Sequence, residues 1–232
     1  MSLIDSDENK EKILKKFFEI SAIEGCSNEI LQRSVIESGF ESRLKDILFD
    51  NGLLDLFIFA NDILNKDVIK EIKMIDISNL GVSTKIRKLM EIRLGLISKN
   101  YDSFRQIIFY LKNNPKTITF SVKTSYEFAD LAWYEIGDKS TDYNFYTKRI
   151  LLSKIYLRTL LYFSKNNSID KSLLYFDSQI KNIMKLAKVK SNISNIVKDL
   201  SNNNCDNNFT SSGYFLKKQL LKLPFIRLYN DR

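Results

Sequence analysis

Residues 120–163 read FSVKTSYEFADLAWYEIGDKSTDYNFYTKRILLSKIYLRTLLYF, and this stretch decides the fold. It holds two segments with helical periodicity, 120–136 and 143–163, joined by the polar connection 137–142. On a helical wheel, apolar side chains cover roughly two thirds of the first segment's circumference and fall on three sides of the second. A helix that is apolar nearly all round is buried, whereas a helix with a single apolar stripe covers a surface. The stretch therefore predicts a helical hairpin at the centre of the protein.

Two interpretations of this hairpin stay open. Its apolar side chains either fill an ordinary core or line an apolar cavity. The large number of aromatic side chains keeps the second interpretation in view, because a cavity for an apolar ligand needs area and shape more than polar groups.

The composition predicts an all-α protein with one core. A chain of 232 residues can bury one full-sized core. With only 2 Pro and 7 Gly, and with many Leu, Ile, Lys and Asn residues, the chain favours helices joined by polar loops. We expect a bundle of about nine helices over residues 8–189. No apolar run reaches the ~18 residues that a membrane span needs, and residues 1–8 (MSLIDSDE) resemble no targeting peptide, so we expect a bacterial cytoplasmic protein.

The chain contains no histidine, which argues against an enzyme. Histidine is the commonest general base, the partner of Ser and Cys nucleophiles, and the commonest metal ligand. Cys26 and Cys205 are far apart and indicate neither a disulfide framework nor a zinc site. The sequence also has no glycine-rich phosphate loop. We expect a non-enzymatic protein without a metal or cofactor.

The N-terminal half resembles that of a TetR-type repressor, in which the second and third helices form a helix-turn-helix. Helical segments are predicted at 10–24, 28–38 and 41–50, with Ser27 as a cap, followed by a longer one from Leu53 to about Leu64. A short helix is expected within residues 65–80, and further helices are expected after Ser83 or Thr84, after Asp102 and after Ser168. The helix after Ser83 or Thr84 turns the aliphatic stem of Arg93 inward, the helix after Asp102 ends before Pro115, and the helix after Ser168 has Leu174 as a candidate core residue. The third segment is near neutral, whereas DNA binding depends on Lys and Arg against phosphates. Despite the net charge of +8, we expect no nucleic-acid partner.

The connection and the helix after it carry a family resemblance. Residues 137–149 read GDKSTDYNFYTKR and lead into Leu152, Ile155, Tyr156 and Thr159. This block resembles the coenzyme Q (ubiquinone) biosynthesis accessory family, the TetR-like lipid-binding proteins that work beside the demethoxyubiquinone hydroxylase. The helix order fits over residues 8–190. One departure is Phe145, where many members have Trp; the aromatic character is kept.

The resemblance implies binding rather than catalysis. It implies that an isoprenoid quinone precursor binds in an apolar pocket and is presented to the membrane-associated hydroxylase. Inward residues of the hairpin would line that pocket: Phe120, Phe128, Leu131, Ala132, Ile150, Leu157, Leu160 and Leu161. The hydroxylase would be contacted by Asp142, Phe145, Tyr146 and Arg149, because aromatics and arginine at a helix start make good interface anchors. The alternative for these residues is a helix cap and ordinary core.

The C-terminal part separates into a linker and a basic amphipathic segment. Residues 190–211 are polar and predict a linker. In residues 212–232, a helix with lysines on one side and Phe and Leu on the other fits a membrane-interface anchor. Its expected membrane contacts are Phe215, Leu216, Lys217, Lys218, Leu220, Lys222 and Leu223. The alternative is a helix that docks on its own domain or on a dimer partner.

The sequence thus predicts an all-α, TetR-like, lipid-binding factor for ubiquinone biosynthesis. It is expected to be a homodimer, peripheral on an anionic membrane surface, the inner membrane of a bacterium. The alternative function is a TetR-like transcription regulator with an apolar effector pocket.

Overall fold

The computed structural model describes residues 6–140 and 143–182, and within these ranges every regular element is a helix. The all-α prediction is therefore confirmed. The TetR-like arrangement stays a prediction. The predicted linker 190–211 and amphipathic helix 212–232 lie outside the described residues, as does Asp142.

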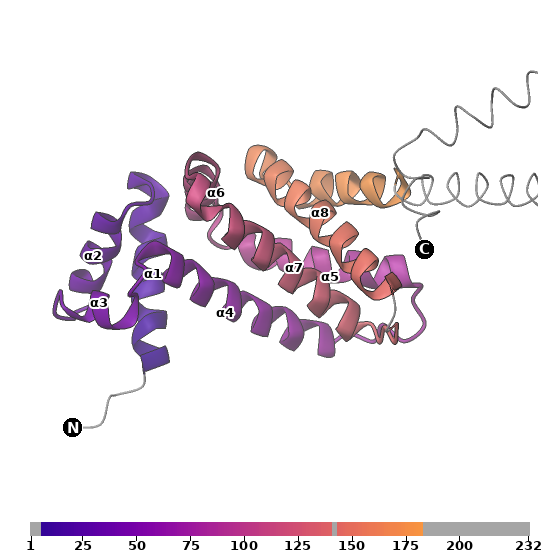
Figure 1. Ribbon diagram of the computed structural model, residues 1–232, viewed down its shortest axis with the longest axis horizontal. Helices are drawn as coiled ribbons and strands as arrows, with labels where there is room; N and C mark the ends of the chain where they lie inside the picture. Colours follow the sequence, from indigo (N-terminus) through magenta and orange to yellow (C-terminus); the bar gives the residue numbers. More distant parts are fainter. Residues whose placement is uncertain (1–5, 141–142, 183–232) are drawn as a thin grey trace, which may run out of the picture. The chain divides into compact units, whose positions relative to one another are not determined.

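The first helices gather around one end of a long fourth helix (Figure 1). They are α1 (Ser6–Glu24), α2 (Asn28–Glu37) and α3 (Leu44–Leu48), followed by α4 (Leu53–Lys73). The predicted cap of α2 is confirmed, because the Ser27 hydroxyl accepts a hydrogen bond from the Ile30 amide at 3.2 Å. α3 has only five residues, and its Lys45 lies 3.1 Å from the carboxylate of Asp46. Lys45 is the only basic residue of α3, and this ion pair offsets its charge.

α4 is longer than predicted. The sequence predicts one helix to about Leu64 and a separate short helix after it, but a single helix continues to Lys73. Val68 and Ile72 lie on its buried side and extend the apolar stripe through the charged residues between them. Gly52 precedes this helix with φ 61°, a conformation that glycine adopts without a steric penalty.

The structure corrects the predicted caps of two helices, α5 (Val82–Ser98) and α6 (Tyr101–Asn113). Their N-caps are Gly81 and Asn100, and neither cap makes a side-chain hydrogen bond. Ser83, Thr84 and Asp102 lie inside the first turns instead. An acidic residue in a first turn still interacts favourably with the helix dipole, so Asp102 fits its observed position.

The second half of the chain forms the predicted hairpin and one further helix. Pro115 begins a short 3-10 helix, η1 (Pro115–Thr117), which leads into α7 (Ile118–Glu135). α8 (Tyr143–Asn166) packs extensively against α7. The last described helix covers residues 169–182, and the Ser168 hydroxyl accepts a hydrogen bond from the Lys171 amide, as predicted. Leu173 and Phe176 of this helix are buried, whereas the predicted core residue Leu174 is 67% exposed.

Two apolar clusters form the core. One joins α1, α2 and the first half of α4, and the other joins the second half of α4 with α5, α7, α8 and helix 169–182. The first contains Ile13, Leu14, Phe17, Leu31, Val35, Phe49, Leu53, Leu56 and Phe57. The second includes Leu89, Met90, Leu94, Phe128, Ala129, Ala132, Ile155, Tyr156, Phe163 and Phe176.

The α7–α8 hairpin is central but not buried all round. Phe128, Ala129 and Ala132 of α7 are fully buried, in agreement with the prediction. Val122 and Tyr134 of α7, and Tyr146 and Ile150 of α8, are each more than half exposed. The prediction of nearly complete burial is therefore wrong for these four residues, which leave large apolar side chains exposed on the hairpin.

Candidate functional site

An apolar cavity of about 290 Å³ lies where the two core clusters meet. Six helices contribute to its wall, namely α1, α4, α5, α6, α7 and α8. Most of the lining is apolar and includes Leu14, Phe18, Phe57, Ala60, Ile63, Leu64, Leu96, Ile97, Phe104, Ile107, Ile108, Leu111, Phe120 and Leu160. The exposed residues Asp67, Lys99 and Asn100 also line it, so the cavity reaches the surface near the junction of α5 and α6.

The hairpin contributes less to this wall than the sequence predicts. Phe120 and Leu160 line the cavity as expected. Phe128 and Ala132 are fully buried in the closed core, and Leu131 packs against that core. Ile150 is 58% exposed and Leu161 is 37% exposed, so both point away from the core, and Leu157 is only partly buried outside the lining. The lipid-binding role stays a prediction for Phe120 and Leu160, and the other six positions do not face this cavity.

Sequence reasoning missed most of the wall, to which α4 and α6 make the largest contributions. Their apolar residues have ordinary amphipathic spacing, which does not distinguish a residue facing a neighbouring helix from one facing an empty space.

The polar part of the wall is centred on Arg93 of α5. The sequence predicts that its aliphatic stem faces inward, but the whole side chain is buried, at 1% exposure. Its guanidinium donates to three neutral oxygens: Nε to the Tyr156 hydroxyl at 2.5 Å, Nη1 to Asn65 Oδ1 at 2.6 Å and Nη2 to Asn61 Oδ1 at 2.7 Å. Arg93, Asn61 and Tyr156 all line the cavity.

Aromatic rings complete the surroundings of this guanidinium. Its carbon Cζ lies 4.8 Å from the centre of the Phe128 ring and 5.1 Å from that of Tyr156, distances at which cation–π attraction operates. The two rings stack on each other with centres 4.2 Å apart. Burial raises the pKa of the Tyr156 phenol, while the nearby Arg93 charge acts in the opposite direction. The phenol therefore stays protonated at neutral pH.

A second polar network holds the turn between α7 and α8. Arg149 of α8 donates from Nε to Asp130 of α7 at 2.5 Å and from Nη1 to Asp138 of the turn at 3.4 Å. The same Nη1 donates to the Phe145 carbonyl at 3.2 Å, and the guanidinium lies 3.4 Å from the centre of the Phe145 ring. One side chain thus fixes the turn to both helices.

Asp138 is the most perturbed carboxylate of this network. Burial opposes its ionisation, but hydrogen bonds from Lys148 at 2.8 Å and Ser140 at 2.6 Å outweigh that effect, and the pKa falls to about 2. The Lys148 ammonium also lies 5.0 Å from the centre of the Trp133 ring. Trp133 is the only tryptophan in the chain, so its fluorescence reports on this turn.

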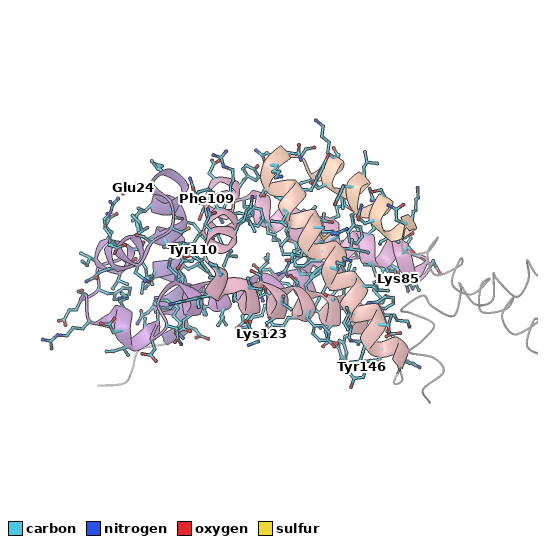
Figure 2. All side chains as sticks on the ribbon, turned by 45° about the horizontal axis from the view of Figure 1, so that its top comes forward. Glu24, Lys85, Phe109, Tyr110, Lys123 and Tyr146 are labelled. Carbon is cyan, nitrogen blue, oxygen red and sulfur yellow. The ribbon has the colours of Figure 1, made fainter. Side chains whose placement is uncertain are left out.

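The predicted partner-binding residues separate into different environments. Tyr146 is 59% exposed and points outward at the start of α8, whereas Phe145 is partly buried (Figure 2). Their rings meet edge to face with centres 5.1 Å apart. Arg149 is 3% exposed, so the prediction of a direct contact with a partner is wrong for it; it positions Phe145 instead. Tyr146 and Ile150, one helical turn apart, form the outward face.

Two classes of feature are absent from residues 6–140 and 143–182. No helix in this part of the chain is long and apolar enough to cross a membrane. The same residues contain no group of three or more Cys, Asp or Glu side chains placed to hold a metal ion.

The comparisons with known proteins point to one family. The sequence model of the COQ9 family matches residues 118–187, which include α7, the turn and α8. The predicted resemblance to the coenzyme Q accessory family is confirmed. The chain is 27% identical over 200 residues to the probable ubiquinone biosynthesis protein coq9, mitochondrial, of Dictyostelium discoideum, a match that covers 82% of this chain and 64% of that protein.

Two mammalian relatives carry a related name. The chain is 25% identical to the ubiquinone biosynthesis protein COQ9, mitochondrial, of Rattus norvegicus, over 78% of this chain and 61% of that one. The Homo sapiens protein of the same name is also 25% identical, over 72% of this chain and 54% of its own length. The chain therefore spans between 54% and 64% of the length of these relatives. All three are eukaryotic and mitochondrial by name, and the bacterial origin expected for this chain stays a prediction.

The turn network predicts a defined response to acid. The folded-state pKa of Asp138 lies below its ordinary value of 3.8, so its ionised form stabilises the fold above about pH 4. That contribution, roughly 2 kcal/mol, is lost as pH falls toward 2. We expect Asp138→Asn to lower the free energy of urea unfolding by about this amount at pH 6, with a difference from wild type that shrinks below pH 4.

Trp133 fluorescence and far-UV circular dichroism would follow the unfolding. Asp62→Asn, at an exposed position of α4, controls for the loss of a surface charge. A difference between wild type and Asp138→Asn that stays constant from pH 6 to pH 3 would contradict the assignment.

Proposed function

We propose that this chain is a non-enzymatic lipid-binding factor in ubiquinone biosynthesis. The cavity is the observation that carries the proposal. Its volume is near the lower end of the range for small-molecule sites, and its wall is mainly apolar with a few convergent polar groups. The names of the three relatives supply the pathway.

The ligand that we propose is an isoprenoid quinone precursor. A prenyl chain has almost no hydrogen-bonding groups, so an apolar wall of suitable area satisfies it. The cavity reaches the surface beside Asp67, Lys99 and Asn100, which allows part of a longer chain to extend beyond the enclosed volume. Phe120 and Leu160 contact the chain in this proposal, together with residues of α4 and α6.

The turn between α7 and α8 is the proposed contact with the demethoxyubiquinone hydroxylase. Tyr146 and Ile150 give α8 an exposed apolar face, and exposed apolar side chains that cluster are typical of interaction sites. The side chains of Arg149 and Asp138 are held by their ion pair, so little of their conformational entropy is lost on binding. The Phe145 ring packs edge to face against the Tyr146 ring.

The remaining parts of the proposal concern the membrane and the oligomer. Residues 212–232 anchor the protein on an anionic membrane surface, and the protein forms a homodimer. The amphipathic pattern of Phe215, Leu216, Lys217 and Lys218 supports the anchor. An anchored carrier has access to a membrane-dissolved lipid.

Filling the cavity tests the lipid-binding part of the proposal. Ala60 lines the cavity from α4, and Ala60→Phe places a ring inside it. We expect ubiquinone-2, a quinone with a short prenyl chain, to bind the wild-type protein in isothermal titration calorimetry. We expect roughly tenfold weaker binding to Ala60→Phe, because the added ring occupies volume that the ligand needs.

Ile118→Phe serves as the control, because Ile118 is 61% exposed on α7 and lies outside the cavity wall. It adds the same ring at the surface and leaves the affinity unchanged. Equal affinities of ubiquinone-2 for wild type and Ala60→Phe, with both proteins folded, would rule out this cavity as the binding site.

Removing the exposed aromatic of the turn tests the partner contact. Tyr146→Ala deletes a side chain that is 59% exposed, so the fold and ubiquinone-2 binding are retained while the hydroxylase no longer co-purifies with the protein. Central aromatic anchors contribute about 2 kcal/mol or more to such interfaces. Phe109→Ala on α6 is the matched control, because Phe109 is 66% exposed and lies well away from Tyr146 (Figure 2). Undiminished co-purification with Tyr146→Ala would count against this surface.

A further inference from the structure

The cavity holds a buried positive charge without its own counter-charge. None of the ion pairs among the described residues includes Arg93. A guanidinium remains protonated in proteins, so this charge cannot be removed by titration. Burying a charge is unfavourable unless it is paired and hydrogen-bonded, and its three partners here are neutral oxygens.

Glu127 and Asp67, the acidic residues that contact this cluster or line the cavity, make no ion pair with Arg93. Glu127 accepts a hydrogen bond from Asn61 at 3.0 Å, so Asn61 lies between Glu127 and Arg93 in this network. The other carboxylate oxygen of Glu127 lies 3.8 Å from the Lys123 ammonium. Asp67 lines the cavity, but its side chain is exposed to solvent and makes no ion pair with Arg93.

Arg93 and Tyr156 retain N–H and O–H groups that no hydrogen bond described above uses. A guanidinium has five N–H groups, and three of them donate in the structure. The Tyr156 hydroxyl accepts from Arg93 and keeps its own proton for another acceptor. Arg93 and Tyr156 both line the cavity, so an oxygen-bearing group that enters it meets donors and an uncompensated positive charge together.

We propose that Arg93, with Tyr156, binds the carboxylate head of an amphiphile whose apolar chain fills the cavity. This rests on the proposed lipid-binding function and specifies its ligand as an isoprenoid precursor whose head group carries a carboxylate. A carboxylate supplies the single negative charge that Arg93 lacks, and its geometry matches the guanidinium fork. A phosphate monoester carries nearly two charges and more acceptor oxygens than these donors serve.

Affinities of four compounds for the full-length protein, freed of bound lipid, test this proposal by isothermal titration calorimetry. Decanoate and 1-decanol differ in the head, and acetate has the same head without a chain; ubiquinone-2 is the neutral reference. In the wild type we expect decanoate to bind at least roughly tenfold more tightly than 1-decanol, because hydrogen bonds to charged groups are the strong ones. Acetate binds too weakly to measure.

Variants then test whether Arg93 and Tyr156 cause the preference for decanoate over 1-decanol. Arg93→Gln abolishes the preference for decanoate over 1-decanol, and Arg93→Lys keeps part of it because the charge remains. Tyr156→Phe keeps the ring packing and lowers the preference several-fold. Arg105→Gln, at an exposed position of α6, removes an equal charge and leaves the preference unchanged.

The outcomes separate this inference from the proposed function. The carboxylate site would be overturned if decanoate and 1-decanol bound the wild type equally, or if the preference for decanoate survived in Arg93→Gln. Neither result would contradict the proposal that the cavity binds lipid. This comparison in the wild type decides the matter even where Arg93→Gln does not fold. If acetate bound as tightly as decanoate, the claim that an apolar chain fills the cavity would be overturned. No binding of any compound, ubiquinone-2 included, would contradict the lipid-binding function itself.

Discussion

The guanidinium of Arg93 is the interaction on which the described fold depends. It lies on α5, hydrogen-bonds to Asn61 and Asn65 of α4 and to Tyr156 of α8, and stacks against Phe128 of α7. Four helices therefore share one buried charge. Desolvating such a charge costs several kcal/mol, and the neutral oxygens and the two rings offset that cost only when all four helices are in place. The same requirement keeps the polar wall of the cavity in a single arrangement.

The helices α7 and α8 contribute to both the cavity and the turn, but different forces stabilise the two. Around the cavity, α8 contributes Tyr156 and Leu160 among apolar neighbours, so shape and a single buried charge dominate. At the turn, Arg149, Asp130, Asp138 and Lys148 form a network of ion pairs. This network frees α8 to expose Tyr146 and Ile150, because the turn does not rely on those side chains for packing. Ion pairs at the start of α8 and an apolar cavity further along the hairpin suit a protein that binds a lipid and meets a partner.

Local signals in the sequence predicted much of the fold. The caps at Ser27 and Ser168, the stop before Pro115 and the α7–α8 hairpin all follow from side chains that act within a few residues. The continuous α4 did not follow, because Val68 and Ile72 gain their stability from α5 and α7, which lie far along the chain. The family resemblance depends on the block from Gly137 to Arg149, and it is confirmed by the match over residues 118–187.

The site was harder to predict than the fold. Periodicity places Phe128 and Ala132 on a buried face, which is correct, but it does not state whether that face meets another side chain or an empty space. Arg93 was expected to bury only its stem, because its partners Asn61, Asn65 and Tyr156 lie 28 to 63 residues away. The burial of Arg149 depends on Asp130 and Asp138 in the same way.

Mass spectrometry of organic extracts of the purified protein is the most direct test of the claim that the cavity holds an isoprenoid lipid. The account predicts an isoprenoid compound of the quinone pathway at about one molecule per chain. A well-folded protein that yields no bound lipid, or a stoichiometric ligand without a prenyl chain, would contradict it.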